Sequence, residues 1–187
     1  MEERNISYQV IRSARKTISI QITPEGEVLV RCPRRMAAGD VRRFVESKSD
    51  WIKKHLSRIA ARPDLPPFTP EEVQELGKQA LAIIPRRVEW FAQKMGVTYG
   101  RITIRNQHTR WGSCSSKGNL NFNCLLVLTP SEVMDYVIVH ELCHRREMNH
   151  SARFWAEVEA VLPDYRERKQ WLKDNGGALI GRLPEKG

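Results

Sequence analysis

Residues 137–155 read VIVHELCHRREMNHSARFW, and this stretch decides how the chain is interpreted. It contains three of the five histidines in the chain, His140, His144 and His150. The apolar residues before the first histidine predict a helix that carries His140 and His144 one turn apart. On such a helix the two imidazoles project within about 40° of each other, so they can meet at one point.

Glu141 completes a His-Glu-x-x-His pattern in this predicted helix. Its side chain projects about 60° from that of His144, near enough to hold a water at the metal without becoming a ligand. Two nitrogen ligands, a general base and room for water are what metal-assisted hydrolysis requires. The pattern therefore predicts a zinc site in which Glu141 is the catalytic base.

A third ligand is needed, because catalytic zinc usually has three protein ligands and one open position. His150 is the candidate, but an uninterrupted helix would carry it about 15 Å along the axis from His140. We therefore expect the helix to end first, with Asn149 in the left-handed region and Ser151 as the cap of a new helix. The spacing of the histidines matches the metzincin pattern, but Glu147 stands in place of its glycine, which counts against a metzincin turn.

The simpler explanation is that two histidines four residues apart coincide on a surface. Here, however, His140 and His144 continue an apolar face, so they lie where a core-facing stripe should run. Buried histidines and a buried carboxylate cost free energy unless they are paired or bind a metal. The full set of residues therefore favours a catalytic metal site over a surface coincidence or a purely structural zinc.

Composition is that of a soluble globular protein, with 41% hydrophobic and 28% charged residues. We expect a cytoplasmic protein without a membrane segment, because no apolar run reaches about 18 residues and the first residues lack a secretory signal. The four cysteines have no CxxC spacing and are expected to be reduced. A net charge of +9 could attract nucleic acid or nucleotides, although a solvated basic face is the commoner explanation.

The chain is predicted to have two parts. Residues 1–62 are interpreted as a small antiparallel sheet of three strands, with a turn at residues 24–26, followed by a covering helix over residues 38–61. Residues 63–70 form a proline-rich linker. Residues 71–187 form the catalytic domain, and the whole is of the α+β class.

The first helix of the catalytic domain has clear end signals. Thr69 is the expected cap with Pro70 in the first helical position, and Gly96 ends the helix after about Met95. Pro85 should kink this helix or divide it in two. The elements expected next are a strand in residues 97–106, a hairpin in 109–124, the motif helix after Pro130, a helix from Ser151, and a last helix from Asp164 to about Lys173, ended by the sequence Asn-Gly-Gly.

Four segments closely resemble the YgjP-like zinc metallopeptidase family, related to the SprT and WLM zincins. They are TRWGSCSSKGNLNFN (109–123), VMDYVIVHELCH (133–144), MNHSARFW (148–155) and LPDYRERKQWL (162–172). The resemblance extends from about residue 76 to residue 176, with a compatible basic sheet region before it. One departure is Arg145, where relatives often carry leucine.

The resemblance implies a zincin-like fold with His140, His144 and His150 as zinc ligands and Glu141 as the catalytic base. It also implies hydrolysis of a peptide or protein substrate, for which a peptidase needs an edge strand, expected here from the hairpin at residues 109–124. Some family members are described as pyrophosphatases that cleave UTP to UMP and pyrophosphate, and this is the alternative. A nucleic-acid-binding module with structural zinc ranks last, because the sequence lacks CxxC knuckles.

Two further residues are weighed near the site. Arg110 could stabilise an oxyanion or hold a phosphate, but satisfying backbone carbonyls and stacking on tryptophan is the commoner role. Tyr165 could donate to the transition state, although packing at a helix start is favoured. Four residues at helical spacing are interpreted as core, namely Phe154, Trp155, Val158 and Leu162.

Overall fold

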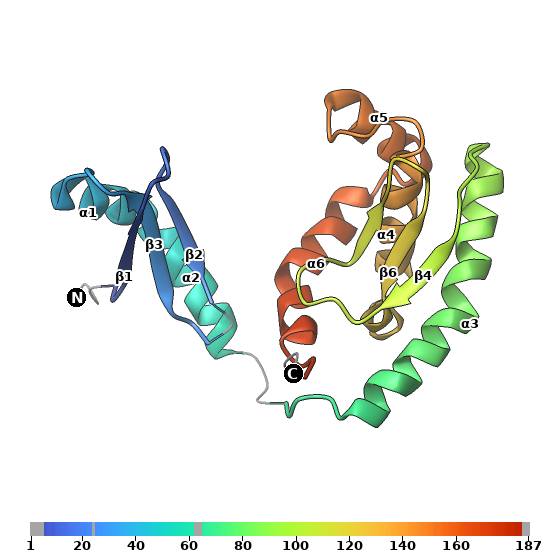
Figure 1. The fold of residues 1–187 in the computed structure, drawn as a ribbon, viewed down its shortest axis with the longest axis horizontal. Helices are drawn as coiled ribbons and strands as arrows, with labels where there is room; N and C mark the ends of the chain where they lie inside the picture. The colour runs from blue at the N-terminus through green and yellow to red at the C-terminus, as the bar shows by residue number, and fades with distance from the viewer. Residues whose placement is uncertain (1–5, 24, 62–64, 185–187) are drawn as a thin grey trace. The chain divides into compact units, whose positions relative to one another are not determined.

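A computed structural model describes residues 6–23, 25–61 and 65–184. The chain divides into two compact units, Met1–Asp64 and Leu65–Gly187, which are described separately (Figure 1). Each unit combines helices with a three-stranded sheet, so the predicted α+β class is confirmed. Pro24 in the predicted turn, residue 62 at the end of the predicted first part and residues 63–64 at the start of the predicted linker lie outside the described residues.

The bounds predicted for the two domains remain a prediction. Among the described helices, none is both long enough and apolar enough to cross a membrane.

The sheet of the first unit is centred on β3 (Val28–Pro33). Strand β1 (Gln9–Ser13) pairs with β3 in parallel and β2 (Ser19–Ile22) pairs with it in antiparallel orientation, so the prediction of an antiparallel sheet is wrong. The physical reason is that β3 is the most buried strand and takes the centre, which separates β1 from β2. Its core-facing residues are Val28, Val30 and Cys32.

Two helices, α1 (Ala38–Glu46) and α2 (Ser49–Ala60), replace the single covering helix predicted for this region. The chain turns after Ser47, whose hydroxyl donates a hydrogen bond of 2.8 Å to the carbonyl of Phe44. Such a local bond competes with continuation of the helix. Trp51, within the region of the predicted covering helix, is 41% exposed. The residues of α1 and α2 that are buried with β3 are Val41, Val45 and Ile52.

Helix α3 (Pro70–Met95) opens the second unit with the predicted end signals. The Thr69 hydroxyl accepts a hydrogen bond from the Glu72 amide at 3.2 Å, and the Glu72 carboxylate accepts one from the Thr69 amide at 2.7 Å. Gly96 ends the helix in the left-handed conformation, with φ of 63°. The helix is continuous through Pro85, so the alternative of two separate helices is excluded.

The sheet of the second unit contains β4 (Ile102–Arg105), β5 (Gly112–Cys114) and β6 (Leu120–Asn123) in the order β4-β6-β5. Strands β5 and β6 form the hairpin predicted in residues 109–124, and β4 lies parallel to β6. A short 3-10 helix, η1 (Cys124–Leu128), follows β6 and packs on α3. Because β6 lies in the centre of this sheet, strand β5 is at one of its edges.

Three helices complete the second unit: α4 (Ser131–Cys143), α5 (Ala152–Val161) and α6 (Tyr165–Ile180). Helix α4 packs against α3, α5, α6 and β5, and Figure 1 shows it behind the sheet. Helix α6 does not end before the Asn-Gly-Gly sequence, so that prediction is wrong. A Cβ at Gly176 would lie 2.9 Å from the Trp111 Nε1 atom, so only glycine leaves room for the indole. Packing of Trp111 on this part of α6 is the physical reason that the helix continues through Gly176.

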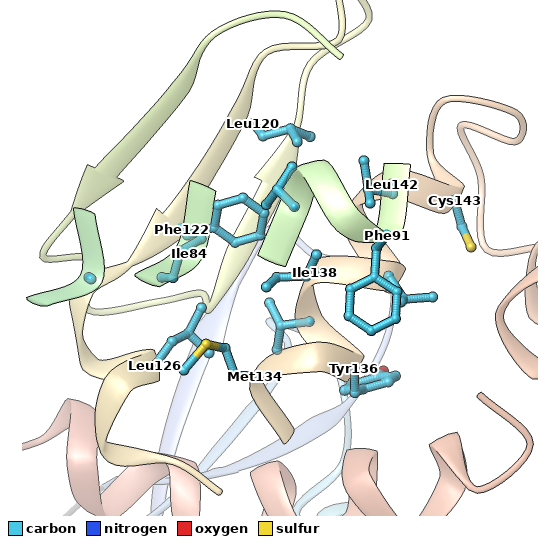
Figure 2. Packing of buried hydrophobic residues seen from close by; sticks show 14 of the residues in the cluster. Ile84, Phe91, Leu120, Phe122, Leu126, Met134, Tyr136, Ile138, Leu142 and Cys143 are labelled. Carbon is cyan, nitrogen blue, oxygen red and sulfur yellow. The ribbon is translucent and has the colours of Figure 1, made fainter. Parts of the chain in front are cut away.

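The core of the second unit fixes the position of α4. Side chains from α3, β6, η1 and α4 meet in one cluster (Figure 2). Burying an aliphatic or aromatic side chain of this size contributes roughly 1.5–3 kcal/mol. The largest contributions come from fully buried residues that include Ile84, Leu120, Phe122, Leu125, Leu126, Ile138 and Leu142.

Candidate metal centre

Helix α4 positions the first two predicted ligands. His140 lies in its last turn, and His144 is the residue that caps its carboxyl end. Their rings are 5.1 Å apart and nearly perpendicular, at 86°. Ile138 and Leu142 project from the opposite side of α4 and are fully buried, which fixes the rotation of the helix about its axis.

His150 returns to the same point from outside the helix. Its Nε2 atom is 3.0 Å from the Nε2 atom of His140, and its ring is 4.8 Å from that of His144. One ligand atom from each of the three histidines lies within 4.8 Å of the other two. The described residues contain no other group of histidine, cysteine or carboxylate side chains gathered in this way.

The turn that returns His150 differs from the one predicted. No non-glycine residue in the described chain has positive φ, so the expectation of a left-handed Asn149 is wrong. Helix α4 already ends at Cys143, whose carbonyl accepts the Glu147 amide at 3.0 Å. The Asn149 side chain instead accepts the Ser151 amide at 3.0 Å, and Ser151 caps α5 as predicted by accepting the amide of Phe154.

The surroundings of His140 and His144 favour neutral imidazoles. Burial, followed by the charges of His144, His150 and Lys169, lowers the pKa of His140 to about 3. Burial also lowers the pKa of His144, although its contact with the Glu147 carbonyl opposes this. Neutral imidazole is the form that binds metals, because it has a free nitrogen lone pair.

The donor set fits a metal ion such as zinc. Two nitrogens bound tetrahedrally at about 2.0–2.1 Å would lie roughly 3.3 Å apart. The His140 and His150 Nε2 atoms are 3.0 Å apart. The Nδ1 atom of His144 lies 3.1 Å from the Glu147 carbonyl, and an N–H donated there would leave Nε2 as the free lone pair, an arrangement typical of metal-binding histidines.

Glu141 is buried beside the histidines, with 5% of its surface exposed. Burial raises the pKa of Glu141 to about 8, and the positive charge of Arg110 acts in the opposite direction. The carboxylate packs directly on Gly112 of β5, where a Cβ atom would lie 2.6 Å from Glu141 Oε1. Only glycine leaves room for the carboxylate in this place, so Gly112 brings β5 against the site.

Strand β5 has a free edge at this point. It pairs only with β6 in the described part of the sheet, so its other edge is available for hydrogen bonding. The loop before β5 is held by the buried side chain of Asn123, which donates to the carbonyls of Gln107 at 2.6 Å and Arg110 at 3.2 Å. An unpaired strand edge thus adjoins Glu141.

Aromatic residues surround the histidines on the α5 and α6 side. Phe154 is buried as predicted, but Trp155 is only half-buried and lies 5.8 Å from the rings of both His140 and His150. Tyr165 stacks on Trp155 at 5.4 Å, in agreement with the packing role favoured for it. Trp155 therefore belongs to the border of the site as well as to the core.

Lys169 is a residue of the site that the sequence interpretation missed. Its ammonium lies 3.8 Å from the centre of the Trp155 ring, and its charge acts on His140. The only signal in the sequence is its position one helical turn after Tyr165. Arg110, weighed from the sequence, is exposed, and its charge acts on Glu141.

The comparison with protein families agrees with this picture. The model of the YgjP-like family, described as a metallopeptidase domain, matches residues 16–76 and 72–175. Among solved structures, the metallopeptidase zymogen of Pyrococcus abyssi abylysin is 23% identical, with 49% of this chain and 93% of that chain covered and a TM-score of 0.45. The metallopeptidase zymogen of Methanocaldococcus jannaschii jannalysin is 22% identical, with 48% and 93% covered and a TM-score of 0.43. No curated protein matches the sequence.

The family match leaves out only short segments at the two ends of the chain. The protein therefore belongs to the YgjP-like metallopeptidase family and is a metal-dependent hydrolase.

Proposed function

We propose that the protein is a zinc-dependent peptidase in which His140, His144 and His150 hold the metal and Glu141 is the catalytic base. The observation that carries this proposal is the convergence of three imidazole nitrogens within 4.8 Å of one another, two of them from the helix that also carries the buried Glu141. A set of three imidazoles with one open position is typical of catalytic zinc. When bound, the metal supplies Lewis-acid chemistry: it acidifies a coordinated water and polarises the carbonyl under attack.

We assign the role of general base to Glu141, the buried carboxylate that follows His140 on α4. Its carboxylate accepts the proton of the attacking water and then delivers it to the leaving amine. The close contact with Gly112 and the burial of the side chain restrict the carboxylate to one place. A fixed base lowers the entropic cost of reaching the transition state.

The free edge of β5 supports a peptide as the substrate. An extended peptide can add to such an edge as a further strand, with hydrogen bonds between main-chain groups. Because β5 adjoins Glu141, a peptide paired with it would pass the base and the histidines. The backbone of Gly112 and the two residues after it would hold the substrate in register.

The alternative is a nucleoside triphosphate pyrophosphatase that converts UTP to UMP and pyrophosphate. The observation in its favour is the positive charge of Arg110, which acts on Glu141, and of Lys169, which acts on His140. The same ligands and base would serve this reaction. An open strand edge, however, has no role in binding a nucleotide, and we therefore favour the peptidase. Binding of nucleic acid rests only on the net charge of +9.

The test offers the zinc-loaded protein an unfolded protein substrate and UTP in parallel. We expect cleavage of the protein substrate, and a loss of at least about 100-fold in the Glu141→Gln variant. Glu132→Gln is the matched control, because Glu132 is an exposed carboxylate on the same helix, and it should retain full activity.

If the protein cleaves only UTP, and if this activity is lost in Glu141→Gln, the protein is a pyrophosphatase and not a peptidase. Undiminished cleavage in Glu141→Gln would remove the role of this residue. Inactivity of the zinc-loaded protein toward both substrates would contradict both functions.

A further inference from the structure

Lys169 lies beside the candidate metal centre, held there by an aromatic contact. Its Nζ atom is 3.8 Å from the centre of the Trp155 ring. The same indole lies 5.8 Å from the rings of His140 and His150. A cation over an aromatic face is attracted by the ring, so Trp155 restricts where the ammonium can lie.

The charge of Lys169 is not neutralised by an ion pair in the described part of the chain. Its neighbours on α6 behave differently. Arg166 pairs with Glu159 at 3.1 Å, and Arg168 pairs with Asp164 at 2.9 Å. Two basic residues of α6 thus have carboxylate partners, one on α5 and one at the N-cap of α6, whereas in the described part of the chain Lys169 and Lys173 have none, and of these two only Lys169 contacts Trp155.

A positive charge in this place opposes the binding of a metal cation. Like charges repel, and although Lys169 is exposed and water weakens the repulsion, it remains appreciable at separations shorter than the Debye length of about 10 Å. An apolar side chain could also pack on Trp155, although without the attraction between the cation and the ring. The ammonium in addition provides a positive group that an anion entering the site can contact.

We propose that the Lys169 ammonium binds an anionic group of the substrate, a carboxylate or a phosphate, next to the metal centre. The inference rests on the proposed function, because the anion is that of the molecule cleaved there. An ammonium has three donors and forms strong charge-assisted hydrogen bonds with such groups. A peptide would supply a terminal or side-chain carboxylate, whereas a nucleotide would supply a phosphate.

The test compares Lys169→Met and Lys169→Arg with the unchanged protein. Methionine keeps an apolar stem on Trp155 and removes the charge, whereas arginine keeps the charge. Lys94→Met is the matched control, because Lys94 makes the same kind of contact with Trp90 at 5.2 Å and does not act on His140 or His144.

The first measurement is the affinity of each metal-free variant for Co²⁺, which needs no substrate. Loss of the repelling charge should tighten cobalt binding about threefold in Lys169→Met, with no change in Lys169→Arg or Lys94→Met. The second measurement titrates the cobalt-loaded proteins with inorganic phosphate and with acetate, followed by the visible spectrum of the metal. Binding of the preferred anion should weaken at least about fivefold in Lys169→Met and recover in Lys169→Arg.

The anion whose affinity falls more in Lys169→Met indicates which group Lys169 binds. A larger loss for acetate indicates a peptide carboxylate, and a larger loss for phosphate indicates the phosphate of a nucleotide. If the unchanged protein binds cobalt but Lys169→Met binds both anions equally well, the inference is wrong while the proposed metal site stands. If the unchanged protein binds no cobalt, the proposed function is wrong and the inference falls with it.

Discussion

The two sides of helix α4 bury different chemistry. Ile138 and Leu142 are fully buried in the main core, whereas His140 and His144 are withdrawn from water on the opposite side. Burying an aliphatic side chain contributes roughly 1.5–3 kcal/mol, while burying a polar group without a partner costs free energy. The apolar side of α4 therefore stabilises the fold. This stability offsets the free-energy cost of burying the two histidines on the other side of the helix.

The largest effect on stability is expected from a substitution on the apolar side of α4. Ile138→Ala should lower the free energy of unfolding by about 2–5 kcal/mol, because it leaves a cavity in a core that is closely packed. Urea unfolding of the metal-free protein measures this change. A loss below about 1 kcal/mol would show that this side of α4 does not carry the stability assigned to it.

The next prediction concerns the ligand side. Zinc at about 100 times its dissociation constant should raise the free energy of unfolding by about 2.7 kcal/mol, and His140→Leu should abolish this gain. In metal-free protein the same substitution should change stability by less than about 1 kcal/mol, because the buried Nδ1 atom of His140 has no hydrogen-bond partner among the described residues. Urea unfolding with and without zinc tests both. A gain that persists in the variant would place the metal elsewhere.

A third prediction tests the contact between α4 and the edge strand. Gly112→Ala should lower stability by about 1–3 kcal/mol and displace Glu141, because the added methyl group would lie 2.6 Å from Glu141 Oε1. Gly77→Ala is the control, since nothing lies within 4 Å of a Cβ there and it occupies helix α3. It should gain about 0.5–1 kcal/mol. Thermal unfolding measures the stability of both variants. If both are stabilised or both are destabilised, the predicted contact between Gly112 and Glu141 is contradicted.

The smallest effect concerns α3, which packs against the stabilising side of α4. Thr69→Ala removes the hydroxyl that accepts the Glu72 amide and should cost about 1 kcal/mol. The metal affinity should stay unchanged, because the Thr69 cap stabilises α3, which packs on the apolar side of α4 and not on the side of the histidines. Chemical unfolding and a metal titration of the same variant measure the two quantities. A weakened metal site would mean that the two sides of α4 are not separable.

Local signals were predictable from the sequence. The capping of α3 by Thr69 and Glu72 and its end at Gly96 depend on residues within one turn, so the pattern alone predicts them. The start of α5 at Ser151 is equally local. The approach of three histidines followed from helical periodicity and the number of ligands that zinc requires.

Features that depend on distant contacts were not predictable. Helix α6 continues through Gly176 because Trp111, far away in the sequence, packs on it. The parallel pairing of β1 with β3 depends on which strand is buried most. Lys169 has an ordinary place on an exposed helix, and only its contact with Trp155 from α5 brings it to the histidines.

X-ray absorption at the zinc edge tests the central claim most directly. For purified, zinc-loaded protein we predict one zinc per chain with three imidazole nitrogens at about 2.0–2.1 Å. In His150→Ala one of these imidazoles should be missing from the spectrum. A sulfur ligand at about 2.3 Å, or a spectrum unchanged by His150→Ala, would contradict the account.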